Sequence, residues 1–104
     1  MAITKYTSPP NILLVKGVNI VTADIYVSIK QGSREITLHG ESLDVSAVGE
    51  DTQIIFYLTQ EQTALFNLRG YAKIQVNWLL SGHRYATEIK NVTVYDNLLA
   101  EVVI

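Results

Sequence analysis

The stretch GYAKIQVNWLLSGHRYATEIK, residues 70–90, decides the fold class of this chain. Its first half alternates apolar and polar side chains, and the apolar positions are Ala72, Ile74, Val76 and Trp78. Strict alternation with a period of two is the pattern of a β-strand that buries one face. The Ser81-Gly82 pair then predicts a tight turn, so the stretch forms two long strands of a hairpin.

A two-residue loop at Ser81-Gly82 fixes which residues of the hairpin lie opposite each other. The pairs that this register predicts are Trp78 with Tyr85, Val76 with Thr87 and Ile74 with Ile89 on one face, and Gln75 with Glu88 and Leu79 with Arg84 on the other. Aromatic and β-branched pairs of this kind stabilise a sheet. The same register sets Lys73 against Lys90, which is unfavourable because like charges repel. A bulge or splayed strand ends would relieve that pair.

The rest of the chain carries the same strand signal in shorter segments. Further strands are predicted over Ile12–Lys16, Thr22–Gln31, Arg34–His39, Leu43–Val48 and Thr52–Leu58, and the second hairpin strand continues to Val92 and Val94. Turn signals recur every 8–12 residues or so, which is typical of a β-sandwich. We therefore expect an all-β protein, an immunoglobulin-like antiparallel β-sandwich of about seven strands. A small closed barrel is the alternative architecture.

One short helix is expected near residues 60–67, before the long hairpin. Thr59 is followed three residues later by Gln62. This is a capping-box pattern, in which each of the two side chains satisfies a backbone N–H group at the start of a helix. The helix would carry the chain from one sheet to the other.

The length and composition fit one small globular domain. The chain has 104 residues, of which 48% are hydrophobic, and no cysteine. This length suffices for one hydrophobic core and not for two. We expect an extended N-terminal arm over residues 1–10, because Pro9-Pro10 favours polyproline geometry, and a single β-sandwich domain over residues 11–104.

Charge and hydropathy argue against several classes of partner. The net charge of −2 gives little electrostatic support for binding nucleic acid. No apolar run approaches the roughly 20 residues of a membrane helix. The N-terminus lacks the apolar segment of a signal peptide, so we expect synthesis in the cytoplasm without export by a cleaved signal.

No catalytic or metal-binding pattern stands out. His39 and His83 lie at a predicted strand end and in the hairpin tip, without the spacing of a metal site. The acidic residues are scattered around turns, and the six glycines stand singly. The sequence therefore predicts no catalytic residue, no metal site and no cofactor, and we expect the protein not to be an enzyme.

Two groups of residues are candidates for contact with other molecules. Tyr26 and Tyr71 fall on the polar faces of their strands, which places them at the surface. The C-terminus is apolar, although the ends of small domains usually fray in water. A strand held by the domain and a contact with another subunit explain it equally well. The candidate interface residues there are Leu98, Leu99, Val102, Val103 and Ile104.

The order of motifs resembles a known family. ILLVKG is followed by IYVSIKQGSREITLHGE, and later by LTQEQT, GYAKIQVNW and GHRYAT. These segments resemble small β-sandwich proteins of tailed phages and prophages of Gram-positive bacteria, similar to the N-terminal domain of upper baseplate proteins. The resemblance covers the chain from about Ile12 onward. It implies a virion or tail-associated structural part.

These expectations combine into one functional hypothesis. The chain is expected to be a non-enzymatic virion protein, associated with a phage tail or baseplate, that acts through protein–protein assembly. Its expected partners are other virion or tail chains and copies of itself, with no nucleic acid, membrane or small-molecule substrate. It would be made in the host cytoplasm and then enter the virion. The alternative is a β-sandwich module that binds carbohydrate or another ligand through Tyr26, Tyr71 and acidic loop residues.

Overall fold

The computed structural model describes residues 2–4, 10–59, 62, 70–95 and 102–103. Within these residues the chain is folded mainly as β-strands, so the prediction of an all-β protein is confirmed. A short 3-10 turn, η1 (Gly40–Ser42), joins the fourth strand to the fifth. The strands are β1 (Ala2–Thr4), β2 (Pro10–Val15), β3 (Asp24–Gln31), β4 (Arg34–His39), β5 (Leu43–Val48), β6 (Asp51–Tyr57), β7 (Tyr71–Leu80), β8 (His83–Ala86), β9 (Lys90–Tyr95) and β10 (Val102–Val103).

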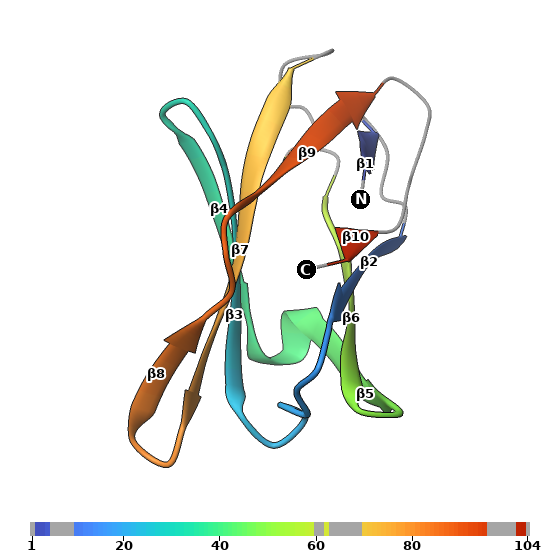
Figure 1. Ribbon diagram of the computed structural model, residues 1–104. Helices are drawn as coiled ribbons and strands as arrows, with labels where there is room; N and C mark the ends of the chain where they lie inside the picture. The colour runs from blue at the N-terminus through green and yellow to red at the C-terminus, as the bar shows by residue number, and fades with distance from the viewer. Residues whose placement is uncertain (1, 5–9, 60–61, 63–69, 96–101, 104) are drawn as a thin grey trace.

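The strands form two sheets that face each other (Figure 1). The first sheet has the order β1-β9-β7-β3-β4. β8 and β9 lie along the same edge of β7, where β9 pairs with its first half and β8 with its second half. The second sheet has the order β10-β2-β6-β5. The described part of the chain thus holds ten strands instead of the seven predicted. Two pairings, β1 with β9 and β10 with β2, are parallel, in contrast to the all-antiparallel arrangement that we expected.

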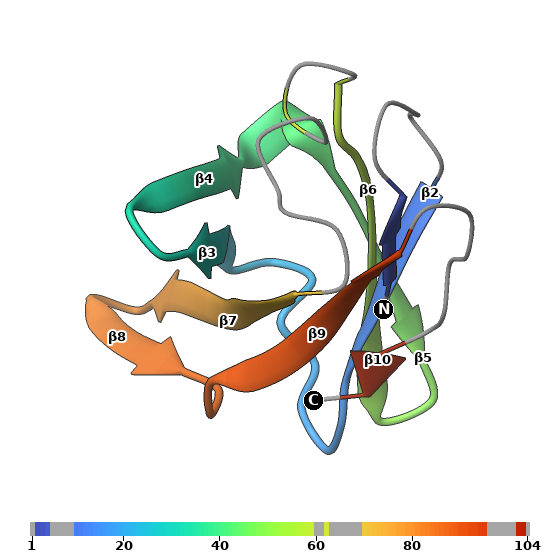
Figure 2. The ribbon, with the colours of Figure 1, turned by 90° about the horizontal axis from the view of Figure 1, so that it is seen from above.

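Both ends of the chain contribute to these sheets. β1 pairs Ala2 with Thr93, and β10 pairs Val102 with Leu13. β9 runs from β7 across to β1, on the side where β2 and β10 lie (Figure 2). The segment predicted as an N-terminal arm therefore holds a strand near its start, and its last residue, Pro10, opens β2.

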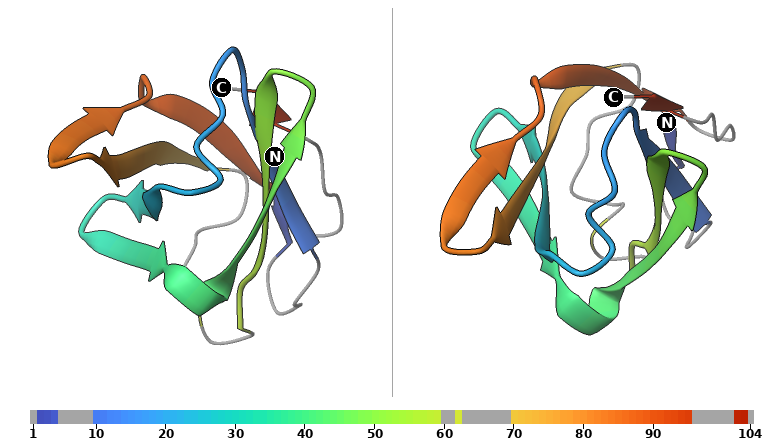
Figure 3. Two further views of the ribbon diagram at one scale, coloured as in Figure 1. Left: turned by 90° about the horizontal axis from the view of Figure 1, so that it is seen from below. Right: turned by 60° about the horizontal axis from the view of Figure 1, so that its bottom comes forward.

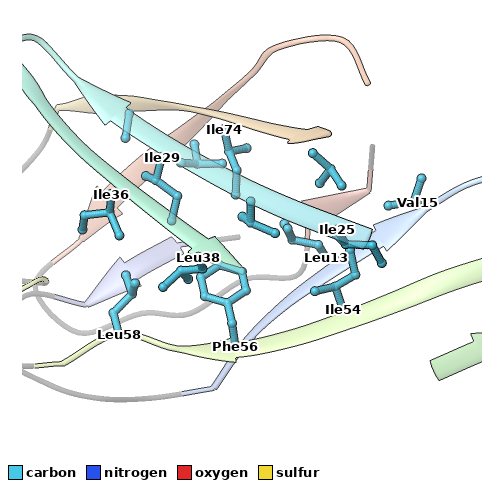
Figure 4. Close-up of a cluster of buried hydrophobic side chains, with 14 of the residues drawn as sticks. Leu13, Val15, Ile25, Ile29, Ile36, Leu38, Ile54, Phe56, Leu58 and Ile74 are labelled. Atoms are coloured by element: carbon cyan, nitrogen blue, oxygen red, sulfur yellow. The ribbon is translucent and has the colours of Figure 1, made fainter. Parts of the chain in front are cut away.

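The core lies between the two sheets and is built from alternate residues of the facing strands (Figure 4). This is the face that the period-two pattern predicts. The apolar residues with no exposed surface are Leu13, Ile20, Val27, Ile29, Ile54, Phe56, Ala72, Ile74 and Val76. Full burial of a large apolar side chain stabilises a fold by about 1.5–3 kcal/mol. Trp78 is half-buried and packs against the edge of this cluster.

Two described segments connect the sheets, one from β4 to β5 and one from β2 to β3. β4 leads through η1 into β5 (Figure 3). The segment between β2 and β3 is held by Thr52, which is fully buried. The Thr52 hydroxyl donates to the Val18 carbonyl oxygen at 2.7 Å and accepts the Ile20 N–H at 3.0 Å. These two bonds fix the backbone on both sides of Asn19 and seat the Ile20 side chain in the core.

The predicted capping box is present after β6. The Thr59 N–H donates to Gln62 Oε1 at 2.9 Å, and the Gln62 N–H donates to Thr59 Oγ1 at 3.1 Å. Each side chain thus satisfies one backbone donor, as the pattern requires. The rest of the helix predicted over residues 60–67 lies outside the described residues.

β7 and β8 form the predicted hairpin. Trp78 lies opposite Tyr85, which confirms the predicted register at this end of the hairpin. The two loop residues have positive φ angles, 53° at Ser81 and 77° at Gly82. Positive φ at both central residues is the signature of a type I′ turn, whose twist matches that of the strands it joins.

A bulge at residues 87–89 separates β8 from β9. Beyond it, β9 pairs with β7 one residue out of the register of β8, so Lys73 lies opposite Asn91 instead of Lys90. The bulge thereby removes the like-charge pair that the unbroken register would impose. The predicted pairing of Ile74 with Ile89 is wrong, because Ile74 lies opposite Lys90. The extra residue takes Ile89 out of the ladder, and its side chain is 58% exposed.

Candidate interaction site

The hairpin of β7 and β8 diverges from the second sheet (Figure 1). Trp78 lies opposite the buried Ile25 in the β3–β7 ladder, so Trp78 is on the core-facing side of its sheet. At the hairpin, the second sheet no longer covers this side of the first sheet. Leu80 is therefore 37% exposed and Tyr85 is 47% exposed. The Trp78 and Tyr85 rings stack with centroids 5.8 Å apart. We call Trp78, Leu80 and Tyr85 together the hairpin patch.

β8 is also an open strand edge. Within the described residues it pairs with β7 alone, and all four of its residues are exposed. The Thr87 N–H donates to the Val76 carbonyl oxygen at 2.9 Å, so Thr87 directs its backbone groups toward β7. Because backbone direction alternates along a strand, Tyr85 does the same, whereas Arg84 and Ala86 direct theirs away from β7. An edge of this kind can accept a further strand.

The outer face of the first sheet carries a polar hollow. Its floor consists of the short side chains Ser28, Thr37 and Asn77 on three adjacent strands, and the longer Tyr26 and Arg84 form its walls. The hollow is open and has a volume of about 290 Å³. In the described part of the chain, the side chains of Ser28, Thr37 and Asn77 make no hydrogen bond. They are therefore available to a bound molecule.

Two further hollows, of about 190 and 380 Å³, continue along the same face. Lys30, Lys73 and Ile89 line both of them. Tyr71, which is 69% exposed, lines the larger hollow, and Glu35 lines the smaller one. Neither lysine forms an ion pair among the residues that the structure describes. The bulge that displaces Ile89 thus also shapes this end of the outer face.

Tyr26, which forms one wall of the hollow, contacts His39 and Asp24. The Tyr26 and His39 rings stack at a centroid distance of 4.1 Å with an interplanar angle of 6°. His39 Nε2 lies 2.5 Å from Asp24 Oδ1, and the Tyr26 hydroxyl donates to Asp24 Oδ2 at 3.4 Å. Because these groups hold one another, the Tyr26 ring has a fixed orientation at the edge of the hollow.

The two predicted surface tyrosines lie on this outer face, as their place on the polar faces of the strands predicts. Sequence reasoning missed Arg84 as a wall of the first hollow and Leu80 as part of the hairpin patch. The signal for Leu80 was present, since Leu79-Leu80 breaks the alternation next to the turn. No local signal marks Arg84, because its role depends on which strands adjoin β7.

The described residues of the apolar C-terminus are on a different part of the molecule. Val102 and Val103 form β10, at the edge of the second sheet. Leu98, Leu99 and Ile104 lie outside the described residues. The structure therefore does not bring the tyrosines and β10 together on one surface, and the candidate interface residues that it describes form two separate groups.

The described residues contain no cluster of three or more His, Cys, Asp or Glu side chains suited to a metal ion. Nor do they form a helix that is long and apolar enough to cross a membrane. No protein-family model matches this chain, and no curated protein matches it at a significant level.

Proposed function

We propose that the chain is a non-enzymatic structural module of a phage or prophage virion that acts through protein–protein assembly. The observation that carries the proposal is the hairpin patch, which adjoins the open edge of β8. Aromatic side chains are enriched at protein interfaces, and a strand edge offers backbone hydrogen bonds to a second chain. Because both features occur on one hairpin, a partner would engage them together.

The virion setting depends on the sequence resemblance to tail-associated β-sandwich proteins. The motifs GYAKIQVNW and GHRYAT, which carry part of that resemblance, fall largely within β7 and β8, the hairpin that supports assembly. We infer an immunoglobulin-like sandwich in which β8 and β9 are one strand interrupted by the bulge. The partners would be other tail chains or further copies, and the protein would pass from the host cytoplasm into the virion.

The C-terminal segment is a second proposed contact. β10 is an edge strand of the second sheet, and edge strands pair readily with other chains. The residues proposed to reach a neighbouring subunit are Leu98, Leu99, Val102, Val103 and Ile104. Deletion of residues 98–104 is expected to weaken assembly. If the deletion lowers only the stability of the monomer, this segment is a structural strand and not an interface.

Light scattering after size exclusion, from micromolar to millimolar protein, tests assembly. The double variant Leu80→Ser/Tyr85→Ser removes the most exposed part of the hairpin patch and leaves the fully buried core unchanged. We expect it to weaken association by about tenfold or more. Tyr57→Ser is the matched control, because Tyr57 is 60% exposed on β6 of the second sheet, and its loss should change nothing.

Assembly would be contradicted by a chain that stays monomeric at every concentration, alone and when mixed with the products of its neighbouring genes. The virion setting has its own test in the gene neighbourhood. Tail and capsid genes are expected beside this gene, and their absence would argue against a virion protein.

The outer face of the first sheet supports a second candidate function, binding of a polar ligand such as a carbohydrate. Unpaired hydroxyl and amide groups on its floor and the cations around it suit a molecule rich in hydroxyl groups that carries negative charge. A glycan array tests this function. Tyr71→Ala and Arg84→Gln are expected to lose binding, whereas Arg34→Gln, an exposed cation that lines none of the three hollows, should retain it. An array without hits, or hits unaffected by these variants, would exclude it.

A further inference from the structure

We propose that two copies of this chain pair through β8, forming an antiparallel dimer centred on Tyr85. The inference deepens the proposed assembly function and rests on it. It begins with the open edge, since β8 pairs with β7 alone among the described strands and all its residues are exposed. A second copy brings the same edge, and two such edges meet under two-fold symmetry.

The backbone restricts how two β8 strands can pair. Only Arg84 and Ala86 direct their N–H and carbonyl groups away from β7. In an antiparallel ladder, residues that face the partner in this way form hydrogen-bonded pairs, and each pair exchanges two hydrogen bonds. All outward groups of β8 are satisfied when Arg84 lies opposite the partner subunit's Ala86. Symmetry repeats this pair on the other side of the two-fold axis.

Other registers are less favourable. Pairing Arg84 with the partner subunit's Arg84 sets two guanidinium groups directly opposite, which is destabilising. Pairing Ala86 with the partner subunit's Ala86 would require the bulged residues 87–88 to join a regular ladder. The register centred on Tyr85 avoids both problems, because each long Arg84 side chain lies beside a small alanine.

The same register joins the two hairpin patches. Tyr85 lies opposite the partner subunit's Tyr85 in a non-hydrogen-bonded pair, and the symmetry axis passes between the two residues. Such pairs have Cα atoms about 4.5 Å apart and bring their side chains into contact. Because Tyr85 already stacks on Trp78, the dimer has a continuous row of rings across the axis, in which exposed aromatic surface becomes buried.

The contact is short, so we expect a weak dimer. A four-residue strand and two hairpin patches fall at the small end of protein interfaces, where dissociation constants in the micromolar to millimolar range are common. The dimer would therefore form at high local concentration, which an array of copies provides.

A cysteine cross-link tests the geometry directly, because the chain has no cysteine of its own. In the proposed dimer, Tyr85→Cys places two thiols in a non-hydrogen-bonded pair, close enough for a disulfide. Ser46→Cys is the matched control, since Ser46 is exposed and central in β5, another open edge strand. Under a glutathione redox buffer, non-reducing gels should show a disulfide-linked dimer that forms several-fold faster for Tyr85→Cys than for Ser46→Cys.

A second variant tests the backbone hydrogen bonds without removing the aromatic rings. Ala86→Pro deletes the outward N–H of Ala86, and proline is tolerated on an edge strand where that group faces solvent. Circular dichroism and tryptophan fluorescence should match those of the natural chain. Light scattering should show association weakened by about tenfold or more, the effect of losing one hydrogen bond on each side of the axis.

The outcomes separate this contact from assembly in general. Faster cross-linking of Tyr85→Cys together with weakened association of Ala86→Pro supports the dimer. If the natural chain associates but Tyr85→Cys cross-links no faster than Ser46→Cys, assembly stands and the β8 contact is wrong. A natural chain that is monomeric at millimolar concentration overturns both the β8 contact and self-association. Assembly with a different chain is then decided by the mixing experiment.

Discussion

The Thr87 hydroxyl accepts the Val76 backbone N–H at 3.1 Å, in place of a carbonyl oxygen from the neighbouring strand. The same hydroxyl donates to the Glu88 carbonyl oxygen at 3.1 Å, and the Thr87 carbonyl oxygen accepts Gln75 Nε2 at 2.9 Å. A side chain therefore completes the ladder at the point where the chain leaves β8 and re-enters as β9 one residue out of register.

Replacing this hydroxyl should destabilise the fold. Thr87→Val keeps the β-branched shape but leaves the partly buried Val76 N–H without its acceptor. We expect the free energy of unfolding to fall by about 1–2 kcal/mol, measured by urea denaturation. Thr87→Ser retains the hydroxyl and should lose less than half as much. Equal stability of the valine variant and the natural chain would mean that the hydroxyl does not support the bulge.

The bulge also shows where sequence reasoning reaches its limit in this fold. Alternation and the two-residue loop predict the pairing of Trp78 with Tyr85 and of Leu79 with Arg84, and both pairs are confirmed. The clash between Lys73 and Lys90 indicates that the register must change. It does not indicate at which residue, because several positions would relieve the same repulsion. At the bulge, the hydrogen bonds of one threonine complete the ladder, and no periodic pattern records them.

A second threonine supports the segment between β2 and β3. Thr52→Val removes the acceptor of the Ile20 N–H and the donor to the Val18 carbonyl oxygen, in a fully buried place. We expect a loss of about 2–4 kcal/mol in the free energy of unfolding, because the buried Ile20 N–H and the partly buried Val18 carbonyl oxygen both lose their partner. Thr52→Ser keeps both bonds and should lose about 1 kcal/mol for its missing methyl group. A valine variant more stable than the serine variant would contradict this assignment.

The candidate site was only partly predictable from the sequence. Period-two alternation places Tyr71 at the surface, where the structure shows it, and predicts which residues fill the core. The polar hollow, in contrast, requires Thr37, Ser28 and Asn77 to stand side by side, which follows from the order β4-β3-β7. Strand order depends on long-range packing, as does the parallel pairing of the two terminal strands. The local alternation of apolar and polar residues predicts neither the strand order nor the parallel pairing.

Stability should depend on pH through Asp51. The Gly17 N–H donates to Asp51 Oδ1 at 2.8 Å, and Lys16 Nζ lies 3.2 Å from Asp51 Oδ2. These interactions, the backbone hydrogen bond first, lower the pKa of Asp51. A carboxyl group whose pKa is lower in the folded than in the unfolded chain stabilises the fold above its unfolded pKa, about 3.9. That contribution is lost as the pH falls through the lower pKa of the folded state.

The variant Asp51→Asn isolates this contribution. It should unfold at a lower urea concentration than the natural chain at neutral pH. The reason is that it lacks the negative charge that the Gly17 N–H and the Lys16 ammonium group stabilise in the folded chain. The two urea midpoints should approach each other as the pH falls below about 3.9 and through the lower pKa of the folded state, where the natural Asp51 also loses its charge. A difference between the midpoints that is the same at neutral and at acidic pH would show that the effect is steric and not electrostatic.

The hairpin that carries the proposed interface can be stabilised at its turn. Ser81 has a φ of 53°, and no other described residue except glycine has a positive φ. Left-handed backbone is unfavourable for most residues, whereas asparagine tolerates it and is preferred in type I′ turns. Ser81→Asn should therefore raise the free energy of unfolding by about 0.5–1 kcal/mol. Ser33→Asn, in the two-residue loop between β3 and β4 but without a positive φ, should leave stability unchanged. If both variants change it equally, the gain does not come from the turn geometry.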